Sequence, residues 1–151
     1  MSHVVDDWVK RRGLSWRLHR LGSRVRSVRE ASEALGVPPS RIVKTIVVVD
    51  GERTIACIVP GDRRLDMAKL RAAVGGSPRL ATRREVRERT GYEAGGVPPS
   101  PLPDYVVVVL DERLLRVDRV YGGGGDEYTL LEFSPRDLVE SGRVIVADIS
   151  G

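Results

Sequence analysis

Alternating apolar and polar residues predict short helices and strands along the whole chain. The segment "SWRLHRL" alternates as a half-buried strand does. The next segment, "SVREASEALG", predicts a helix, because Ser27 and Glu30 can form a capping box and Gly36 can close the last turn. Residues 41–49, "RIVKTIVVV", are almost wholly apolar, which is typical of a strand buried on both faces. Asp50-Gly51 then predicts a tight turn into an antiparallel strand over 53–59.

The remaining segments extend this mixture to the end of the chain. Further helices are expected over 4–12, 67–74 and 83–90 and after Ser134-Pro135, and further strands in "YVVVVLD", near 115–121, in "YTLLEF" and in "RVIVADI". About seven strands and four or five helices, with hairpins among the helices, predict an α+β fold. We expect a mixed, mostly antiparallel sheet that curls toward a barrel and is flanked by helices.

Size and composition narrow the class of protein. A chain of 151 residues has the usual size of one domain, so we expect residues 1–151 to form a single domain. No apolar stretch approaches the ~20 residues that cross a bilayer, and we expect a soluble, cytoplasmic protein without a membrane partner. One cysteine and two histidines predict neither a disulfide framework nor a zinc site, so no metal or cofactor is expected. Cys57, within an apolar strand, is expected to be a core residue.

Positive charge is concentrated near the N-terminus. Residues 1–30 hold eight Arg and Lys against three acidic residues, whereas the net charge of the whole chain is +4. Such a surface could meet a phosphate backbone, because arginine matches phosphate oxygens. It could equally be the solvated surface of a heat-adapted protein. Only three lysines occur beside 22 arginines, which draws attention to Lys44 in the apolar run.

The candidates for a functional site are Lys44 and two glycine-rich segments. An ammonium group inside a strand with two apolar faces must face a polar cavity or be paired, unless it lies near the strand's start and reaches water along its own stem. The segment "TGYEAGGVPPSPLP", residues 90–103, is a loop whose bare amides around Gly95 and Gly96 could hold an oxyanion, or it is an ordinary connection. Gly122 to Gly125 could bind phosphate or form a hairpin tip.

The order of three motifs resembles the YbaK/prolyl-tRNA-synthetase-associated domain family. They are "EALGVPPSRIVKT", "RTGYEAGGVPP" and "GGGGDEYTLLEFSPRDL", and the resemblance covers nearly the whole chain. It implies a mixed sheet with flanking helices and an aminoacyl-tRNA deacylase that removes a wrong amino acid, notably alanine or cysteine, from the proline tRNA. The implied partners are the acceptor end of tRNA and an aminoacyl-tRNA synthetase. Lys44-Thr45 is more like the YbaK branch.

The resemblance also implies roles for individual residues. Lys44 would hold the terminal adenosine or its phosphate, while the amides of Gly95 and Gly96 would bind the developing oxyanion, and water or the substrate's own side chain would attack. The expected substrate-binding residues are Thr45, Val97, Pro99, Gly123 and Gly124. Departures from the family pattern at Leu21, Tyr121 and Tyr128 leave the amino acid undecided. A tRNA-binding module without hydrolysis and a protein-interaction scaffold are the alternative functions.

Overall fold

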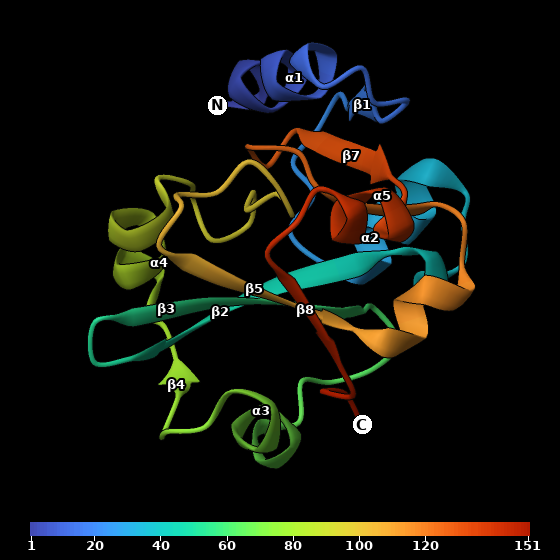
Figure 1. Cartoon of the computed structure of the whole chain (residues 1–151). Helices are drawn as coiled ribbons and strands as arrows, with labels where there is room; N and C mark the ends of the chain where they lie inside the picture. Colours follow the sequence, from blue (N-terminus) through green and yellow to red (C-terminus); the bar gives the residue numbers. More distant parts are fainter.

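The fold contains two β-sheets and five α-helices (Figure 1). The computed structural model describes all residues, 1–151. The larger sheet has the strand order β4 (Arg79–Leu80), β2 (Val43–Asp50), β3 (Arg53–Pro60), β5 (Val106–Asp111) and β8 (Val144–Ala147). The smaller sheet has the order β1 (Arg17–Arg20), β7 (Thr129–Phe133) and β6 (Val120–Gly123).

Strand directions confirm a mixed α+β fold but not a closed barrel. Four of the six strand pairs are antiparallel, and β5 pairs in parallel with both β3 and β8. The chain forms two sheets instead of the single curled sheet that we expected, and β4 and β8 remain open edges. The predicted strand "YTLLEF" forms β7, which pairs with β1 and β6 in the smaller sheet and not with an edge of the larger sheet.

Four of the five helices begin at a side-chain cap, and α1 has none. They are α1 (Ser2–Arg11), α2 (Val28–Leu35), α3 (Met67–Val74), α4 (Arg83–Thr90) and α5 (Pro135–Glu140), with short 3₁₀ helices over Pro39–Arg41 and Glu112–Arg116. The Ser27 hydroxyl accepts the Glu30 amide at 3.1 Å, and Gly36 closes α2 in the left-handed conformation. The strand expected near 115–121 begins only at Val120, because the preceding residues form the second 3₁₀ helix.

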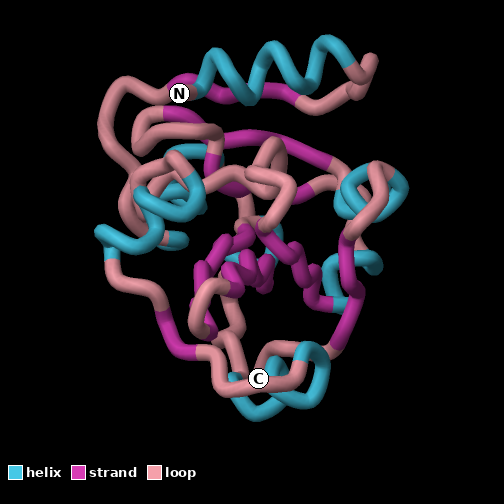
Figure 2. Tube along the Cα trace, turned by 60° about the vertical axis from the view of Figure 1, so that its left-hand side comes forward, coloured by secondary structure: helices cyan, strands magenta, loops and turns pink.

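Both faces of the larger sheet are buried, as the apolar run 41–49 predicts. On one face, Val43 and Val47 pack in a cluster with Leu131 and Phe133 of the smaller sheet. On the other face, Val48 packs with residues that include Leu70 of α3. Figures 1 and 2 show this layering, with α3 and the C-terminus on one side and the smaller sheet and α1 on the other. No helix is both long enough and apolar enough to cross a bilayer.

The two sheets meet along the start of β2. A parallel bridge joins Ile42, just before β2, to Tyr121 of β6, and Ile42 also packs with Ala31 of α2 and Leu130 of β7. Since β4 pairs with β2 only at Val48 and Val49, the first half of β2 is left free on that edge and lies next to β6. This seam brings both predicted motif segments together.

Candidate functional site

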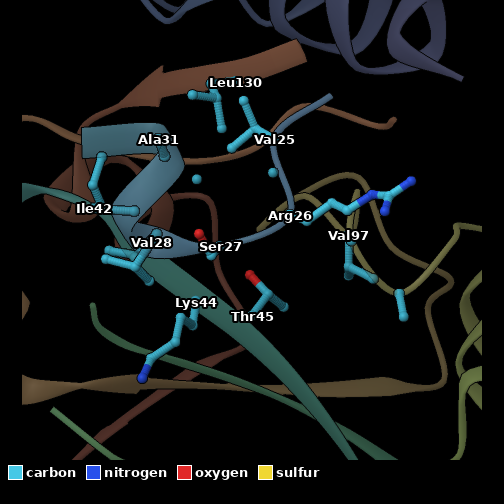
Figure 3. A pocket seen from close by; sticks show the side chains of 15 residues that line it. Val25, Arg26, Ser27, Val28, Ala31, Ile42, Lys44, Thr45, Val97 and Leu130 are labelled. Atoms are coloured by element: carbon cyan, nitrogen blue, oxygen red, sulfur yellow. The ribbon is translucent and has the colours of Figure 1, made fainter. Parts of the chain in front are cut away.

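A cavity of about 190 Å³ lies at the seam between the two sheets. It is formed by the start of α2, the first half of β2, the loop after α4 and the strands β6 and β7 (Figure 3). More than half of its lining residues are apolar. The full lining comprises Val25, Arg26, Ser27, Val28, Ala31, Ile42, Val43, Lys44, Thr45, Ala94, Gly95, Val97, Gly122, Gly123 and Leu130.

Five of the eight residues that the sequence singled out line this cavity. They are Lys44, Thr45, Gly95, Val97 and Gly123. The other three lie outside its lining. Pro99 lines a separate cavity of about 440 Å³ between α1 and α5, whereas Gly96 and Gly124 are packed against backbone.

The two glycine segments are packed directly on each other. A Cβ atom at Gly96 would lie 2.7 Å from the Asp126 Cα, and one at Gly124 would lie 2.8 Å from the Thr129 carbonyl oxygen. The Gly125 amide donates to the Gly96 carbonyl at 2.9 Å, which fastens the two segments together. Glycine is therefore required here for close backbone approach. Of the run 122–125, Gly122 and Gly123 line the cavity, whereas Gly124 and Gly125 pack against backbone.

The Gly96 amide, which was expected to bind an oxyanion, is already hydrogen-bonded, whereas other amides of the loop are free. The Gly96 amide donates to the Glu93 carbonyl at 2.9 Å, so the hydrogen bond expected for an oxyanion is already occupied. The amides of Ala94, Gly95 and Val97, in contrast, donate no hydrogen bond within the protein. All three residues line the cavity. Gly95 thus keeps its expected place, and Val97, the next free amide along the loop, replaces Gly96 in the candidate anion-binding pair.

Lys44 is half-buried, and its ammonium group turns away from the cavity. Its side chain leaves β2 on the side opposite Thr45 (Figure 3), and Nζ donates to the Arg63 carbonyl at 2.6 Å. Burial lowers the Lys44 pKa below its ordinary value of 10.5, the positive charge of Arg64 lowers it further, and Asp62 partly opposes both. The strand therefore pairs this charge with a backbone carbonyl, as a lysine among apolar residues requires.

The hydroxyl group of Thr45 is buried without a hydrogen-bond partner. In Figure 3 it points toward the Ser27 side chain across the cavity. A buried hydroxyl without a partner loses its hydration, so a ligand that supplies a hydrogen bond here gains affinity. Ser27 was not among the predicted site residues, although its place at the start of a capped helix near the Lys44 motif was a signal for it.

Several other polar or reactive side chains lie outside the cavity. Cys57 of β3 is fully buried on the face of the larger sheet that packs with Leu70 of α3, and this burial raises the pKa of its thiol to about 12. His19 contacts Glu132 at 2.8 Å and packs edge-on against the Tyr121 ring. The Tyr128 hydroxyl accepts a hydrogen bond from Arg24 at 3.1 Å. No group of three His, Cys, Asp or Glu side chains is arranged to hold a metal ion.

The chain is similar to a known protein family and to several known proteins. Residues 23–141 match the family described as "Aminoacyl-tRNA editing domain". The chain is 35% identical over 115 residues to the uncharacterized protein YwhH of Bacillus subtilis, a match that covers 76% of this chain and 73% of that protein. It is 34% identical over 106 residues to the proline–tRNA ligase of Thermotoga neapolitana, a match that covers 70% of this chain but only 18% of the ligase.

Solved structures show the same fold over the whole chain. The crystal structure of the hypothetical protein APE2540 has a TM-score of 0.93 and 49% identity, covering 97% of this chain and 99% of that one. A proposed trans-editing enzyme for prolyl-tRNA synthetase has a TM-score of 0.90 and 34% identity, covering 99% of this chain and 96% of that one.

Proposed function

This chain belongs to the aminoacyl-tRNA editing domain family, and from that premise we propose that it hydrolyses the ester bond of a mischarged aminoacyl-tRNA. We propose that residues 1–151 form one such domain, that it acts in the cytoplasm, and that its substrate is alanine or cysteine on the proline tRNA. The observation that carries the proposal is one cavity lined by Lys44, the unpaired Thr45 hydroxyl and the free amides of Gly95 and Val97.

The cavity supports selection of a small amino acid. A volume of about 190 Å³ is close to that of an engineered apolar cavity of ~150 Å³ that holds benzene. A small side chain and an attacking water molecule fit this volume together. The apolar walls from Val25, Val28 and Leu130 receive the side chain, while the Thr45 hydroxyl binds the amino group or the water.

Hydrolysis requires stabilisation of the negative charge that develops on the carbonyl oxygen of the ester. Water attacks the ester carbonyl carbon, a bond forms from the water oxygen to that carbon, and the bond from the carbon to the ribose oxygen breaks. The proton of water passes to the ribose oxygen, which gives free amino acid and tRNA. The amides of Gly95 and Val97 bind the oxyanion, and their rigid loop keeps them in place without reorganisation.

In this proposal the Lys44 ammonium holds the terminal adenosine or its phosphate. It must exchange the Arg63 carbonyl for the substrate, a rotation that the flexible four-carbon stem of lysine allows. The departures from the family pattern at Tyr121 and Tyr128 favour the second candidate function, a module that binds aminoacyl-tRNA without hydrolysing it. A synthetase partner is part of the proposal, since the matched ligase carries a similar segment.

Release of amino acid from a panel of mischarged tRNAs tests the proposal. The wild-type protein should release one or a few small amino acids, whereas Lys44→Ala should lose this activity by at least about a hundredfold, as expected when a positioning charge is removed. Lys10→Ala is the matched control, because Lys10 is exposed and pairs with Asp6 on α1. Salt-dependent tRNA binding without release of any amino acid would favour the binding module. Wild-type activity in Lys44→Ala would remove Lys44 from the site.

A further inference from the structure

A second, strongly basic cleft adjoins the cavity. Its volume is about 370 Å³, and it is lined by Arg24, Arg26, Arg83, Gly95 and Glu127. Arg26 and Gly95 also line the first cavity, so the cleft and the cavity are neighbours that share these two residues. The lining brings the loop before α2 together with the start of α4, segments about sixty residues apart in the sequence.

The arginines of this cleft have few partners inside the protein. Arg26 lies 3.5 Å from the Glu127 carboxylate, Arg24 donates to the Tyr128 hydroxyl, and Arg83 has no ion pair. Three guanidinium groups and one carboxylate leave a net charge of +2. Several arginines close to the cleft in sequence are instead paired with acids, in the pairs Arg29–Glu33, Arg84–Glu88 and Arg87–Glu93. The cleft therefore gathers three guanidinium groups around one carboxylate next to the cavity.

We propose that this cleft binds the phosphodiester backbone of the unpaired 3′ end of the tRNA whose aminoacyl group enters the cavity. The inference rests on the proposed function and names the part of the substrate that the cavity cannot hold. A nucleotide chain that delivers its last ribose to the cavity must pass the shared residues Arg26 and Gly95. Guanidinium groups match phosphate oxygens with paired hydrogen bonds and recognise the backbone without reading its sequence. Tyr128 keeps Arg24 oriented toward this path.

Binding of the RNA oligonucleotide ACCA, measured by fluorescence anisotropy at several salt concentrations, tests the cleft directly. The double variant Arg24→Ala/Arg83→Ala removes two cations that do not line the catalytic cavity. Because each phosphate contact on a single strand contributes about 0.7 to the salt slope, the slope should fall by about 1.4 and binding should weaken roughly tenfold at 0.15 M salt. Arg71→Ala is the control, since Arg71 is exposed on α3 at the opposite side of the molecule. Glu127→Gln should strengthen binding, because it removes the only negative charge of the cleft.

A comparison of two substrates separates this inference from the proposed function. Aminoacyl-tRNA carries phosphates, whereas the 3′-aminoacyl ester of adenosine carries none. Arg24→Ala/Arg83→Ala should hydrolyse the tRNA ester roughly tenfold more slowly at subsaturating substrate and the adenosine ester at the wild-type rate. An unchanged salt slope and equal rates on both substrates would overturn the inference while leaving the hydrolase intact. If the wild-type protein hydrolyses neither ester, the proposed function fails, and the salt slope of ACCA binding alone decides whether the cleft binds RNA.

Discussion

Replacement of Gly96 by alanine should separate the two glycine segments and destabilise the protein. The added Cβ atom would lie 2.7 Å from Cα, 2.8 Å from N and 2.9 Å from C of Asp126. Favourable carbon contacts are found at 3.5–4.0 Å, so the new atom is about 1 Å too close. All three neighbours are backbone atoms, so no side chain can rotate away and one of the two segments must shift. Gly96 does not have a positive φ, so the predicted cost comes from the clash and not from backbone strain.

The expected cost is that of inserting a methyl group into a packed interior, about 1–3 kcal/mol in the free energy of unfolding. For a chain of this length it corresponds to a fall in Tm of about 3–9 °C. Denaturant unfolding followed by circular dichroism measures the free energy, and a thermal scan measures Tm. Because the shifted loop carries Gly95 and Val97, the same variant should also release amino acid more slowly from a mischarged tRNA.

Two other glycines provide matched controls for the same chemical change. At Gly22 the new Cβ would meet nothing within 4 Å, so Gly22→Ala should be neutral or slightly stabilising. At Gly95 the nearest atom is the Glu127 Cγ at 3.2 Å, which belongs to a flexible side chain, so Gly95→Ala should cost less than Gly96→Ala. If Gly96→Ala unfolds within about 0.5 kcal/mol of Gly22→Ala, the packing of the two segments is not what fixes the loop.

Three further predictions follow from buried polar groups. An NMR titration of the Lys44 side chain should give a pKa below 10.5. The unfolded chain then binds this proton more tightly than the folded one, so the free energy of unfolding should rise with pH between the lowered pKa and 10.5 in the wild type but not in Lys44→Met. A fall in the free energy of unfolding over this pH range would contradict the lowered pKa. Asp111→Ala should lower the free energy of unfolding in urea by about 2–4 kcal/mol, because it leaves the amides of Arg113 and buried Ile149 without their acceptors at 2.9 and 3.2 Å. A change below about 0.5 kcal/mol would show that water replaces the carboxylate. Cys57, whose thiol has a pKa raised to about 12 by burial, should resist Ellman's reagent at pH 8 in the native protein and react fully in denaturant, and rapid native labelling would show that the strand opens.

Local signals in the sequence were sufficient for most of the secondary structure. The helices over 67–74 and 83–90 have the predicted bounds, since their capping residues Asp66 and Thr82 act within one turn. The hairpin at Asp50-Gly51 was also predicted, because the turn and the apolar run are adjacent. The two-residue strand β4 was missed, because its length leaves no periodic pattern and its pairing with β2 is a tertiary contact.

The candidate site shows the same division between local and tertiary information. Sequence motifs alone pointed to Lys44, Thr45 and the loop at Gly95, which do line one cavity. Whether an amide of that loop is free depends on which carbonyl lies opposite it, and this distinguished Val97 from Gly96. The direction of the Lys44 ammonium depends on the Arg63 carbonyl, and the basic cleft depends on two segments that meet only in the folded chain. Residue types and caps are encoded locally, whereas the partners of polar groups are set by contacts between distant segments, so only the tertiary structure decided which groups are left free to bind a ligand.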